Sequence, residues 1–286
     1  MKLAEADIRT REVLNWSGLH LFHAPPSSCS QKVRIFLNLK GIPWTSHPVD
    51  IGASENMRPY YLGINPRGLV PTMVLEGEVH IESNDIIALL EARHPAPALI
   101  PPGRQAELAA LLQHENELHL DLRTISFRFL MDPDHPPKSA EDLAQYATGG
   151  SGTVGGQKDA RLAQEIGFWQ SVIDQGIPDT DVRAAVSRFR AAFERLEADL
   201  ATGPYLLGEQ LTVLDIAWLV YTHRLVLAGY PLERLHPRVH RWAANLAAHQ
   251  AFTAEIALPP PIAAAVAARR TVLEAAGATL ETVCAL

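Results

Sequence analysis

The first third of the chain alternates between strand-like and helix-like apolar patterns. A short apolar run in residues 19–22 is followed by a helical pattern in residues 28–40, which Gly41 ends. Residues 44–51 are then expected to form a second strand, parallel to the first because a whole helix separates the two. These elements predict a β-α-β unit.

Two further β runs and a helix complete this part of the chain. Residues 72–75 and 78–81 are two short strand-like runs joined by Glu76-Gly77, a dipeptide that favours a hairpin turn. A helical apolar pattern then opens at Glu82 or Ser83 and is stopped by a proline. The predicted order is therefore β-α-β followed by β-β-α.

Beyond a linker rich in Pro and Gly, apolar positions recur at helical spacing almost to the end of the chain. One long helix is predicted over residues 104–130, and Asp179 or Thr180 can cap a second helix. Thr212 and Asp215 have the spacing of a capping box with Asp in place of Glu, which predicts the start of a third. The second domain is expected to be all-α.

The predicted fold class is thus an α/β domain followed by an all-α domain. The expected divisions are an N-terminal extension over 1–18, the α/β domain over 19–94, a linker over 95–103, the all-α domain over 104–258 and a C-terminal tail over 259–286. Residues 131–160 are rich in Pro and Gly, so we expect an irregular excursion there within the second domain.

Composition and charge narrow the range of functions. The chain has 286 residues and a formal net charge of −7, and it lacks the clustered Lys and Arg that nucleic acid or an anionic membrane would bind. No apolar run is long enough to span a bilayer, and the first residues do not resemble a secretory signal. Cys29 and Cys284 cannot build a disulfide framework or a zinc cluster, so we expect a cytoplasmic protein without a metal site.

Four motifs, SSCSQKVRIFL, NPRGLVPTMV, ESNDII and GEQLTVLDIAW, resemble those of the cytosolic glutathione transferases in order and spacing. The resemblance covers about residues 19–256. The first motif is similar to the zeta-class (maleylacetoacetate isomerase) signature, and other stretches look closer to tetrachlorohydroquinone reductive dehalogenases and lignin β-etherases. The resemblance implies a thioredoxin-like first domain, glutathione as cosubstrate, a homodimer and a role in detoxification.

The first motif would activate a thiol. Glutathione reacts as its thiolate, and the start of the helix over 28–40 offers unpaired N–H groups and partial positive charge to an anion. The predicted catalytic residues are Ser27, Ser28 and Cys29. The resemblance implies Ser27 as the activating hydroxyl of zeta-like enzymes and Cys29 as the residue that resolves a glutathionyl intermediate in the dehalogenases. Alternatively, Cys29 packs the helix start and the serines only cap it.

Other motifs would bind the rest of glutathione. The resemblance implies a cis bond between Val70 and Pro71, next to backbone groups that pair with the tripeptide; the alternative is a trans proline that begins an edge strand. Glu82 would receive the γ-glutamyl ammonium and Ser83 its carboxylate, or the two would only cap a helix. Three further polar residues could reach the glycine end or be solvated surface: Lys40, Asn65 and Arg67.

The resemblance also implies that an electrophile binds between the two domains. Four residues are predicted to line that pocket: His23, Phe127, Met131 and Tyr221. Helical periodicity equally allows the aromatic residues of the second domain to be core. The excursion over 131–160 could act as a lid.

Three functions stay open. The leading one is an enzyme that activates the thiol of glutathione to attack an apolar, aromatic electrophile or to remove a group from it reductively. The second is a glutathione-dependent thiol-disulfide oxidoreductase or deglutathionylase that uses Cys29, although the sequence Cys29-Ser30-Gln31-Lys32 lacks the second cysteine of a C-x-x-C pair. The third is a non-catalytic protein of this fold that binds a ligand or a partner.

Overall fold

The computed structural model describes residues 1–132 and 138–286, and the chain forms two compact units. One unit consists of residues 1–93 and 136–176, and the other of residues 94–135 and 177–286. The chain therefore leaves the first unit close to the predicted linker but returns to it. This return differs from the expected excursion within the second domain.

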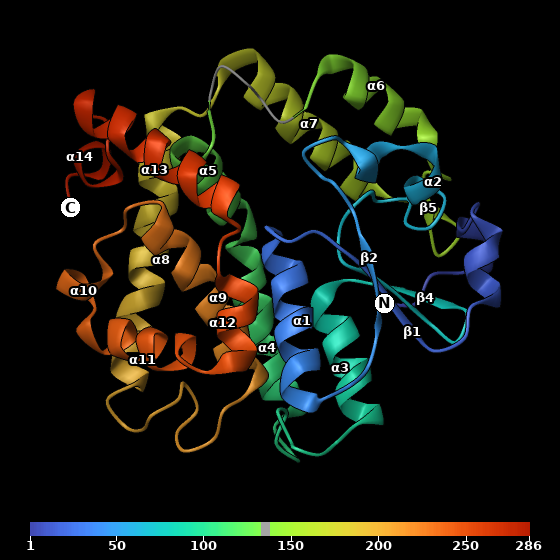
Figure 1. Cartoon of the computed structure of the whole chain (residues 1–286), viewed down its shortest axis with the longest axis horizontal. Helices are drawn as coiled ribbons and strands as arrows, with labels where there is room; N and C mark the ends of the chain where they lie inside the picture. The colour runs from blue at the N-terminus through green and yellow to red at the C-terminus, as the bar shows by residue number, and fades with distance from the viewer. Residues whose placement is uncertain (133–137) are drawn as a thin grey trace. The chain divides into compact units, whose positions relative to one another are not determined.

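The first unit is built around a four-stranded sheet with the strand order β2-β1-β3-β4 (Figure 1). Its strands are β1 (Leu19–His23), β2 (Thr45–Pro48), β3 (Thr72–Leu75) and β4 (Glu78–Ile81). β2 is parallel to β1, whereas β3 is antiparallel to both β1 and β4. Glu76 and Gly77 have φ values of 50° and 75°, the pair of positive angles that a type I′ hairpin turn requires. The predicted order of elements along the chain and the predicted parallel pairing of the first two strands are confirmed.

Helices cover one face of this sheet. α1 (Ser28–Lys40) and α3 (Ser83–Arg93) contact each other and lie on the same side of the sheet (Figure 1). Gly41 ends α1 in the left-handed conformation, with φ 62°, which a residue without a Cβ adopts at little cost.

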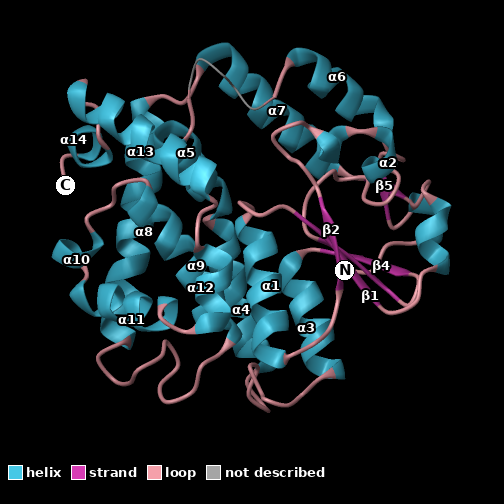
Figure 2. Cartoon of the chain, in the orientation of Figure 1, coloured by secondary structure: helices cyan, strands magenta, loops and turns pink. Residues whose placement is uncertain are grey.

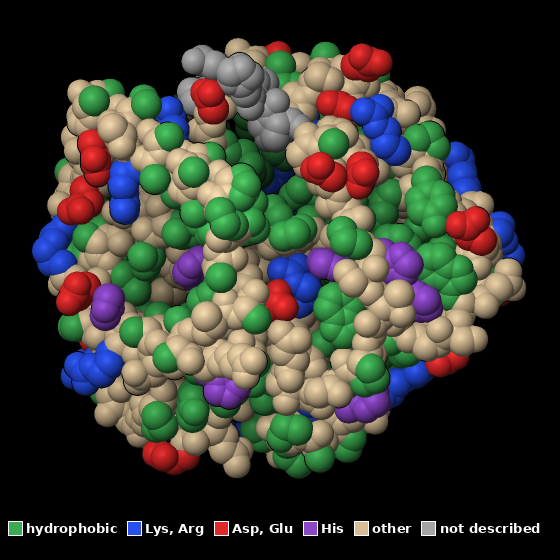
Figure 3. Space-filling view, in the orientation of Figure 1, with side chains coloured by type: hydrophobic (Ala, Val, Ile, Leu, Met, Phe, Trp, Pro, Cys, Tyr) green, Lys and Arg blue, Asp and Glu red, His purple; other side chains and the backbone are tan. Residues whose placement is uncertain are grey.

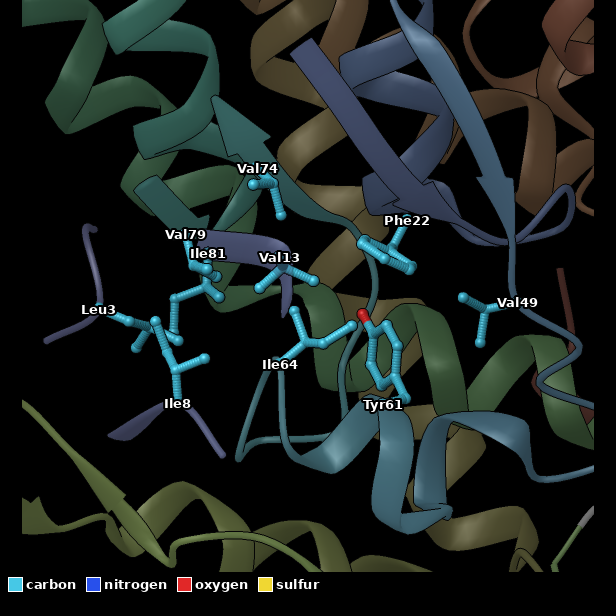
Figure 4. Packing of buried hydrophobic residues seen from close by; sticks show 10 residues of the cluster. All are labelled: Leu3, Ile8, Val13, Phe22, Val49, Tyr61, Ile64, Val74, Val79 and Ile81. Carbon is cyan, nitrogen blue, oxygen red and sulfur yellow. The ribbon is translucent and has the colours of Figure 1, made fainter. Parts of the chain in front are cut away.

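An apolar cluster covers the other face, and the N-terminal segment supplies part of it. Figure 4 shows side chains from β1, β3 and β4 converging with side chains from the N-terminal segment and from residues 49–64. The cluster consists of Leu3, Ile8, Val13, Phe22, Val49, Tyr61, Ile64, Val74, Val79 and Ile81. The short helices on this side are η1 (Glu5–Asp7), η2 (Arg11–Asn15), η3 (Glu55–Met57) and α2 (Pro59–Leu62). The predicted N-terminal extension is thus part of the core of the first unit.

Residues 138–176 form a regular addition to the first unit (Figure 2). Its elements are α6 (Ala140–Gly149), β5 (Thr153–Val154), β6 (Gln157–Lys158) and α7 (Ala160–Gln175). The buried carboxylate of Asp7 accepts hydrogen bonds from Thr153 Oγ1 at 2.7 Å and from the N–H groups of Gly155 and Gly156 at 2.7 and 3.1 Å. The N-terminal segment therefore binds the turn between β5 and β6.

Lys138 ties the start of this addition to the same unit. Its buried ammonium donates to the backbone oxygen of Ile51 at 2.5 Å and to Ser54 Oγ at 3.1 Å. The polar residues that hold residues 138–176 in the first unit lie far away in the sequence, which explains why the local pattern did not assign this segment correctly.

The second unit is helical, as predicted. Its helices are α4 (Gln105–Glu117), α5 (His119–Leu130), α8 (Asp179–Asp199), α9 (Val213–Leu227), α10 (Leu232–Leu235), α11 (Pro237–Ala247), α12 (Gln250–Ile256), α13 (Pro260–Ala275) and α14 (Leu280–Cys284). The expected single helix over 104–130 is divided at Leu118, whose N–H bonds to the oxygen of Glu115, three residues back. The expected side-chain cap at Asp179 or Thr180 is also wrong, because Pro178 is the N-cap of α8.

α9 is the most buried helix of this unit. The predicted capping box is confirmed: Thr212 and Asp215 exchange hydrogen bonds at its start. The buried Asp215 carboxylate also accepts from Leu206 N at 2.9 Å and from Trp242 Nε1 at 3.1 Å. The predicted tail over 259–286 is helical, and its helices α13 and α14 contact α5 and α8.

Among the described residues, no single helix has the length and apolar character needed to cross a membrane. The bent pair α12 and α13, with an angle of 65° between them, meets the length and composition requirement only when both are taken together.

Candidate functional site

Strand register brings three of the predicted motifs to one end of the sheet. Phe22 is paired with Thr72, and Thr72 is paired with Ile81. The loop after β1, the residues before β3 and the residues after β4 therefore leave the sheet at the same end. These segments are residues 24–27, Val70-Pro71 and Glu82-Ser83.

The start of α1 carries the predicted catalytic residues. Ser27 is the N-cap, and its Oγ accepts a hydrogen bond from Ser30 N at 3.2 Å. Ser28, which is buried, and Cys29, which is half-buried, are the first two residues of the helix. Ser30 has no exposed surface, and its Oγ accepts from Ala24 N at 3.3 Å. The start of α1 therefore brings the hydroxyls of Ser27 and Ser28 and the Cys29 thiol together at the positive end of the helix, whereas Ser30 holds the preceding loop.

The loop before β3 lies next to this helix start. The bond between Val70 and Pro71 is cis. Ser27 Oγ is 3.5 Å from the backbone oxygen of Val70, which joins the two segments. In the part of the chain that the structure describes, the N–H of Val70 donates no hydrogen bond. A backbone donor and acceptor thus lie beside the N-terminus of α1.

Asn65 holds the loop before β3 through hydrogen bonds. It is almost fully buried, and its Nδ2 donates to the backbone oxygen of Leu69 at 2.8 Å and to Thr72 Oγ1 at 2.9 Å. Tyr61 Oη also lies 2.8 Å from Thr72 Oγ1. The structure therefore places Asn65 where it shapes the loop, without an exposed amide for a ligand.

Lys40 lies at the other end of α1 from the predicted site. Its Nζ is 2.6 Å from Glu91 Oε2, and the side chain of Lys40 has no exposed surface. The ammonium group also lies 5.4 Å from the centre of the Phe36 ring. Lys40 is therefore neither solvated surface nor close to Ser27, since a helix of 13 residues separates the two.

Glu82 and Ser83 follow β4 at the start of α3. Glu82 has φ 67°, a left-handed conformation that is uncommon for a residue with a side chain. Its Oε1 is 2.5 Å from Nη1 of Arg67, and 40% of its side chain stays exposed. Arg67 also binds Asp159, the N-cap of α7. Ionic contacts to both carboxylates outweigh burial and raise the pKa of Arg67, so the guanidinium is permanently charged.

The four predicted electrophile-pocket residues are divided between the two units. His23 belongs to the first unit, where its ring nitrogens lie 2.8 Å from Ser46 Oγ and 3.2 Å from Arg34 Nη1. Tyr221 is buried in the core of the second unit, and its Oη is 2.9 Å from His119 Nδ1. Two residues of the second unit remain partly exposed: Phe127 and Met131.

A group of histidines lies on the sheet at β1 and β2. His20 Nδ1 is 3.0 Å from His47 Nε2, and the ring of Trp16 stacks on His47 with 4.9 Å between ring centres. Burial, with His20 close by, lowers the pKa of His47. Figure 3 shows histidine side chains among hydrophobic ones on the viewed face. Among the described residues, no three His, Cys, Asp or Glu side chains come together as metal ligands.

Sequence reasoning missed Asp159. The residue follows a Gly-rich stretch, and in the sequence it carries only the signal of a helix N-cap. Its partner Arg67 is 92 positions away, so no local pattern could have indicated the pair.

Both units match known sequence families. Residues 26–93 match the Glutathione S-transferase, N-terminal domain family, and residues 173–245 match the Glutathione S-transferase, C-terminal domain family. The chain is 30% identical over 234 residues to a maleylacetoacetate isomerase from Pseudomonas aeruginosa, a match that covers 79% of this chain and 90% of that protein. It is 26% identical over 217 residues to a tetrachloro-p-hydroquinone reductive dehalogenase from Sphingobium chlorophenolicum, which covers 72% and 82%.

The fold is also similar to solved structures. The β-etherase LigF from Sphingobium sp. strain SYK-6 has a TM-score of 0.71 and 21% identity, with 83% of this chain and 98% of that chain covered. The prediction of a thioredoxin-like domain followed by a helical domain is confirmed. The predicted similarity to maleylacetoacetate isomerases and to a reductive dehalogenase is confirmed by the sequence matches. By its two domain matches and by its sequence identity to these relatives, the chain belongs to the glutathione S-transferase family.

Proposed function

We propose that the chain binds glutathione at the end of the sheet where α1 begins, and that it activates the thiol for attack on an apolar, aromatic electrophile or for reductive removal of a group from it. One observation carries this proposal: Ser27, Ser28 and Cys29 lie at the N-terminus of α1, beside the backbone of Val70. A sulfur anion there would meet the positive end of a 13-residue helix.

The rest of the tripeptide fits the neighbouring groups. The N–H and C=O of Val70 would pair with the backbone of the central cysteine, as an added strand does. Glu82 would take the γ-glutamyl ammonium, and the hydroxyl and N–H of Ser83 its carboxylate. The site would thereby offer partners of both signs to the zwitterionic end of glutathione.

Ser27 and Cys29 support different reactions. In the proposed conjugation, a hydroxyl of Ser27 or Ser28 donates to the thiolate of glutathione. In the proposed reductive route, the Cys29 thiolate attacks the sulfur of a glutathionyl adduct, so that a protein-glutathione disulfide forms and the former adduct leaves with the electron pair. A second glutathione thiolate then releases Cys29 and yields glutathione disulfide. The relatives include both an isomerase and a reductive dehalogenase by name, and this chain keeps both groups.

A second candidate function uses only the reductive route. Cys29 lies at the second position of α1, a place that suits a thiolate, so the chain could act as a glutathione thiol-disulfide oxidoreductase or deglutathionylase. Loss of mixed-disulfide reduction in Cys29→Ala with conjugation preserved would favour this function. A chain that fails to bind millimolar glutathione in calorimetry would instead be a non-catalytic ligand- or partner-binding protein.

The test of the leading function is a conjugation screen with aromatic electrophiles and three parallel variants, Ser27→Ala, Ser28→Ala and Cys29→Ala. At least one is expected to lose activity while it still binds glutathione. Wild-type rates in all three would exclude the start of α1 as the activating site. We also propose a cytoplasmic homodimer, which gel filtration and cell fractionation would check.

A further inference from the structure

Arg67 joins two carboxylates that come from different parts of the first unit. Its Nη1 is 2.5 Å from Glu82 Oε1, and its Nε and Nη2 are 2.5 and 3.2 Å from Oδ2 and Oδ1 of Asp159. The contact with Asp159 is bidentate, the geometry in which a guanidinium and a carboxylate bind best. The side chains of Arg67 and Asp159 are only 15% and 14% exposed, whereas that of Glu82 is 40% exposed.

Asp159 is held in place by its own segment. Its Oδ1 accepts from Arg161 N at 3.3 Å, and its N–H donates to the oxygen of Gly152 at 3.2 Å. From α6 of the same segment, the Tyr146 hydroxyl donates to the backbone oxygen of Arg67. Residues 138–176 therefore bind both the side chain and the backbone of Arg67. Arg67 in turn holds the Glu82 carboxylate in its position.

Asp159 changes the net charge of the cluster that it forms with Arg67 and Glu82. Arg67 and Glu82 alone would be a neutral pair, and the guanidinium would repel an incoming ammonium group. Asp159 neutralises the guanidinium from the less exposed side. Two carboxylates against one guanidinium leave a net negative charge, and the exposed partner that can meet a cation is Glu82.

We propose that Asp159 is a positioning residue of the glutathione site: through Arg67 it orients Glu82 and restores the negative charge that attracts the γ-glutamyl ammonium. The inference rests on the proposed function. Asp159 lies between the two stretches that match the family, 26–93 and 173–245. Asp159 thus supplies a determinant of glutathione recognition from outside the matched stretches.

The test measures how much the α-ammonium group of the ligand contributes to its affinity. Asp159→Asn keeps the shape and the helix cap but removes the charge, and calorimetry would compare its binding of S-methylglutathione with its binding of S-methylated glutaryl-cysteinyl-glycine, which lacks only the α-ammonium. We expect affinity for S-methylglutathione to fall about 5–10-fold, with no more than a twofold change for the deaminated ligand. In turnover, KM for glutathione should rise while kcat is unchanged, and Asp159→Glu should recover part of the affinity.

Asp174→Asn is the matched control, because Asp174 is exposed on α7 and, among the described residues, accepts only from Gln170 Nε2 at 2.9 Å. An equal loss for both ligands in Asp159→Asn would show a merely structural role and overturn the inference, and so would unchanged affinity for S-methylglutathione. If the wild-type protein bound neither ligand, the proposed function itself would be wrong and the inference would fall with it.

Discussion

Ser27 Oγ lies 3.5 Å from the backbone oxygen of Val70, 43 positions further along the chain. This contact joins the N-cap of α1 to the residue before the cis proline, so the helix terminus and the loop backbone face the same space. Within the described residues, the hydroxyl accepts from Ser30 N, and its proton is held only by the long contact to Val70. We therefore expect the Ser27 proton to be available to the sulfur anion of the proposed site.

Ser27→Ala separates capping from activation. Loss of a side-chain cap costs about 1 kcal/mol of stability. Loss of a charge-assisted hydrogen bond to the thiolate, worth about 1.5–3 kcal/mol, would lower kcat/KM by roughly 10–100-fold. Ser139→Ala is the matched control, because Ser139 Oγ accepts from Asp142 N at the start of α6 as Ser27 Oγ accepts from Ser30 N. Denaturation curves and conjugation rates of both variants provide the comparison, and equal activity would show that Ser27 only caps the helix.

Lys40→Ala should damage stability without affecting glutathione binding. The variant would remove the ammonium group that lies 2.6 Å from the buried Glu91 carboxylate, at an expected cost of about 3–5 kcal/mol in the free energy of unfolding. The double variant Lys40→Met with Glu91→Leu should recover most of that loss. Denaturant unfolding and calorimetry with S-methylglutathione would check both expectations. If the Lys40→Met/Glu91→Leu protein folded but bound S-methylglutathione much more weakly, Lys40 would contribute to glutathione binding and this expectation would be wrong.

Asp7→Asn should loosen the addition formed by residues 138–176. Burial alone would raise the pKa of Asp7, but hydrogen bonds from Thr153, Gly156 and Gly155 outweigh it and lower the pKa below the ordinary value of 3.8. The carboxylate therefore contributes stability that is complete above that value and is lost as pH falls through the lower native pKa. Unfolding measured near neutral pH should show a loss of about 2–3 kcal/mol in the variant, and the difference should shrink in acid. A constant difference would contradict this account.

Lys138 should make stability depend on pH in the alkaline range. Burial lowers its pKa from 10.5 to about 8. Between these values the unfolded chain binds the proton and the native chain does not, so the free energy of unfolding should rise with pH. Relative to Lys138→Met, the wild-type protein should gain about 2–3 kcal/mol across this range. Denaturation of both proteins at several pH values would measure the gain, and parallel curves would show that Lys138 titrates normally.

Local chemistry explains which elements were predictable. The hairpin was found because Glu76-Gly77 supplies two positive φ angles, and α9 because Thr212 and Asp215 form a complete box within four residues. The break at Leu118 has no such signal, since the apolar spacing continues through it. Residues 138–176 were assigned to the wrong unit because buried polar contacts at positions distant in sequence, such as that of Asp7 with Thr153, decide where they pack.

In the candidate site, too, contacts between residues distant in sequence could not be predicted from local patterns. Motifs and the family resemblance predicted that Ser27, Val70 and Glu82 serve one site, and strand register brings their segments to the same end of the sheet. Motifs could not show that Lys40 is buried against Glu91, nor that Asp159 binds Arg67. Such pairings depend on tertiary contacts between charges that look equally solvated in the sequence.

The central claim is that the N-terminus of α1 stabilises the thiolate of bound glutathione. The most direct test is a titration of the glutathione thiol in the binary complex, followed by the ultraviolet absorbance of the thiolate, with Cys29→Ala as the protein so that only the ligand's sulfur is observed. We predict a pKa about 1–2 units below that of free glutathione, with most of the shift lost when Ser27→Ala is added. A bound thiol that titrates as it does in water would contradict the account.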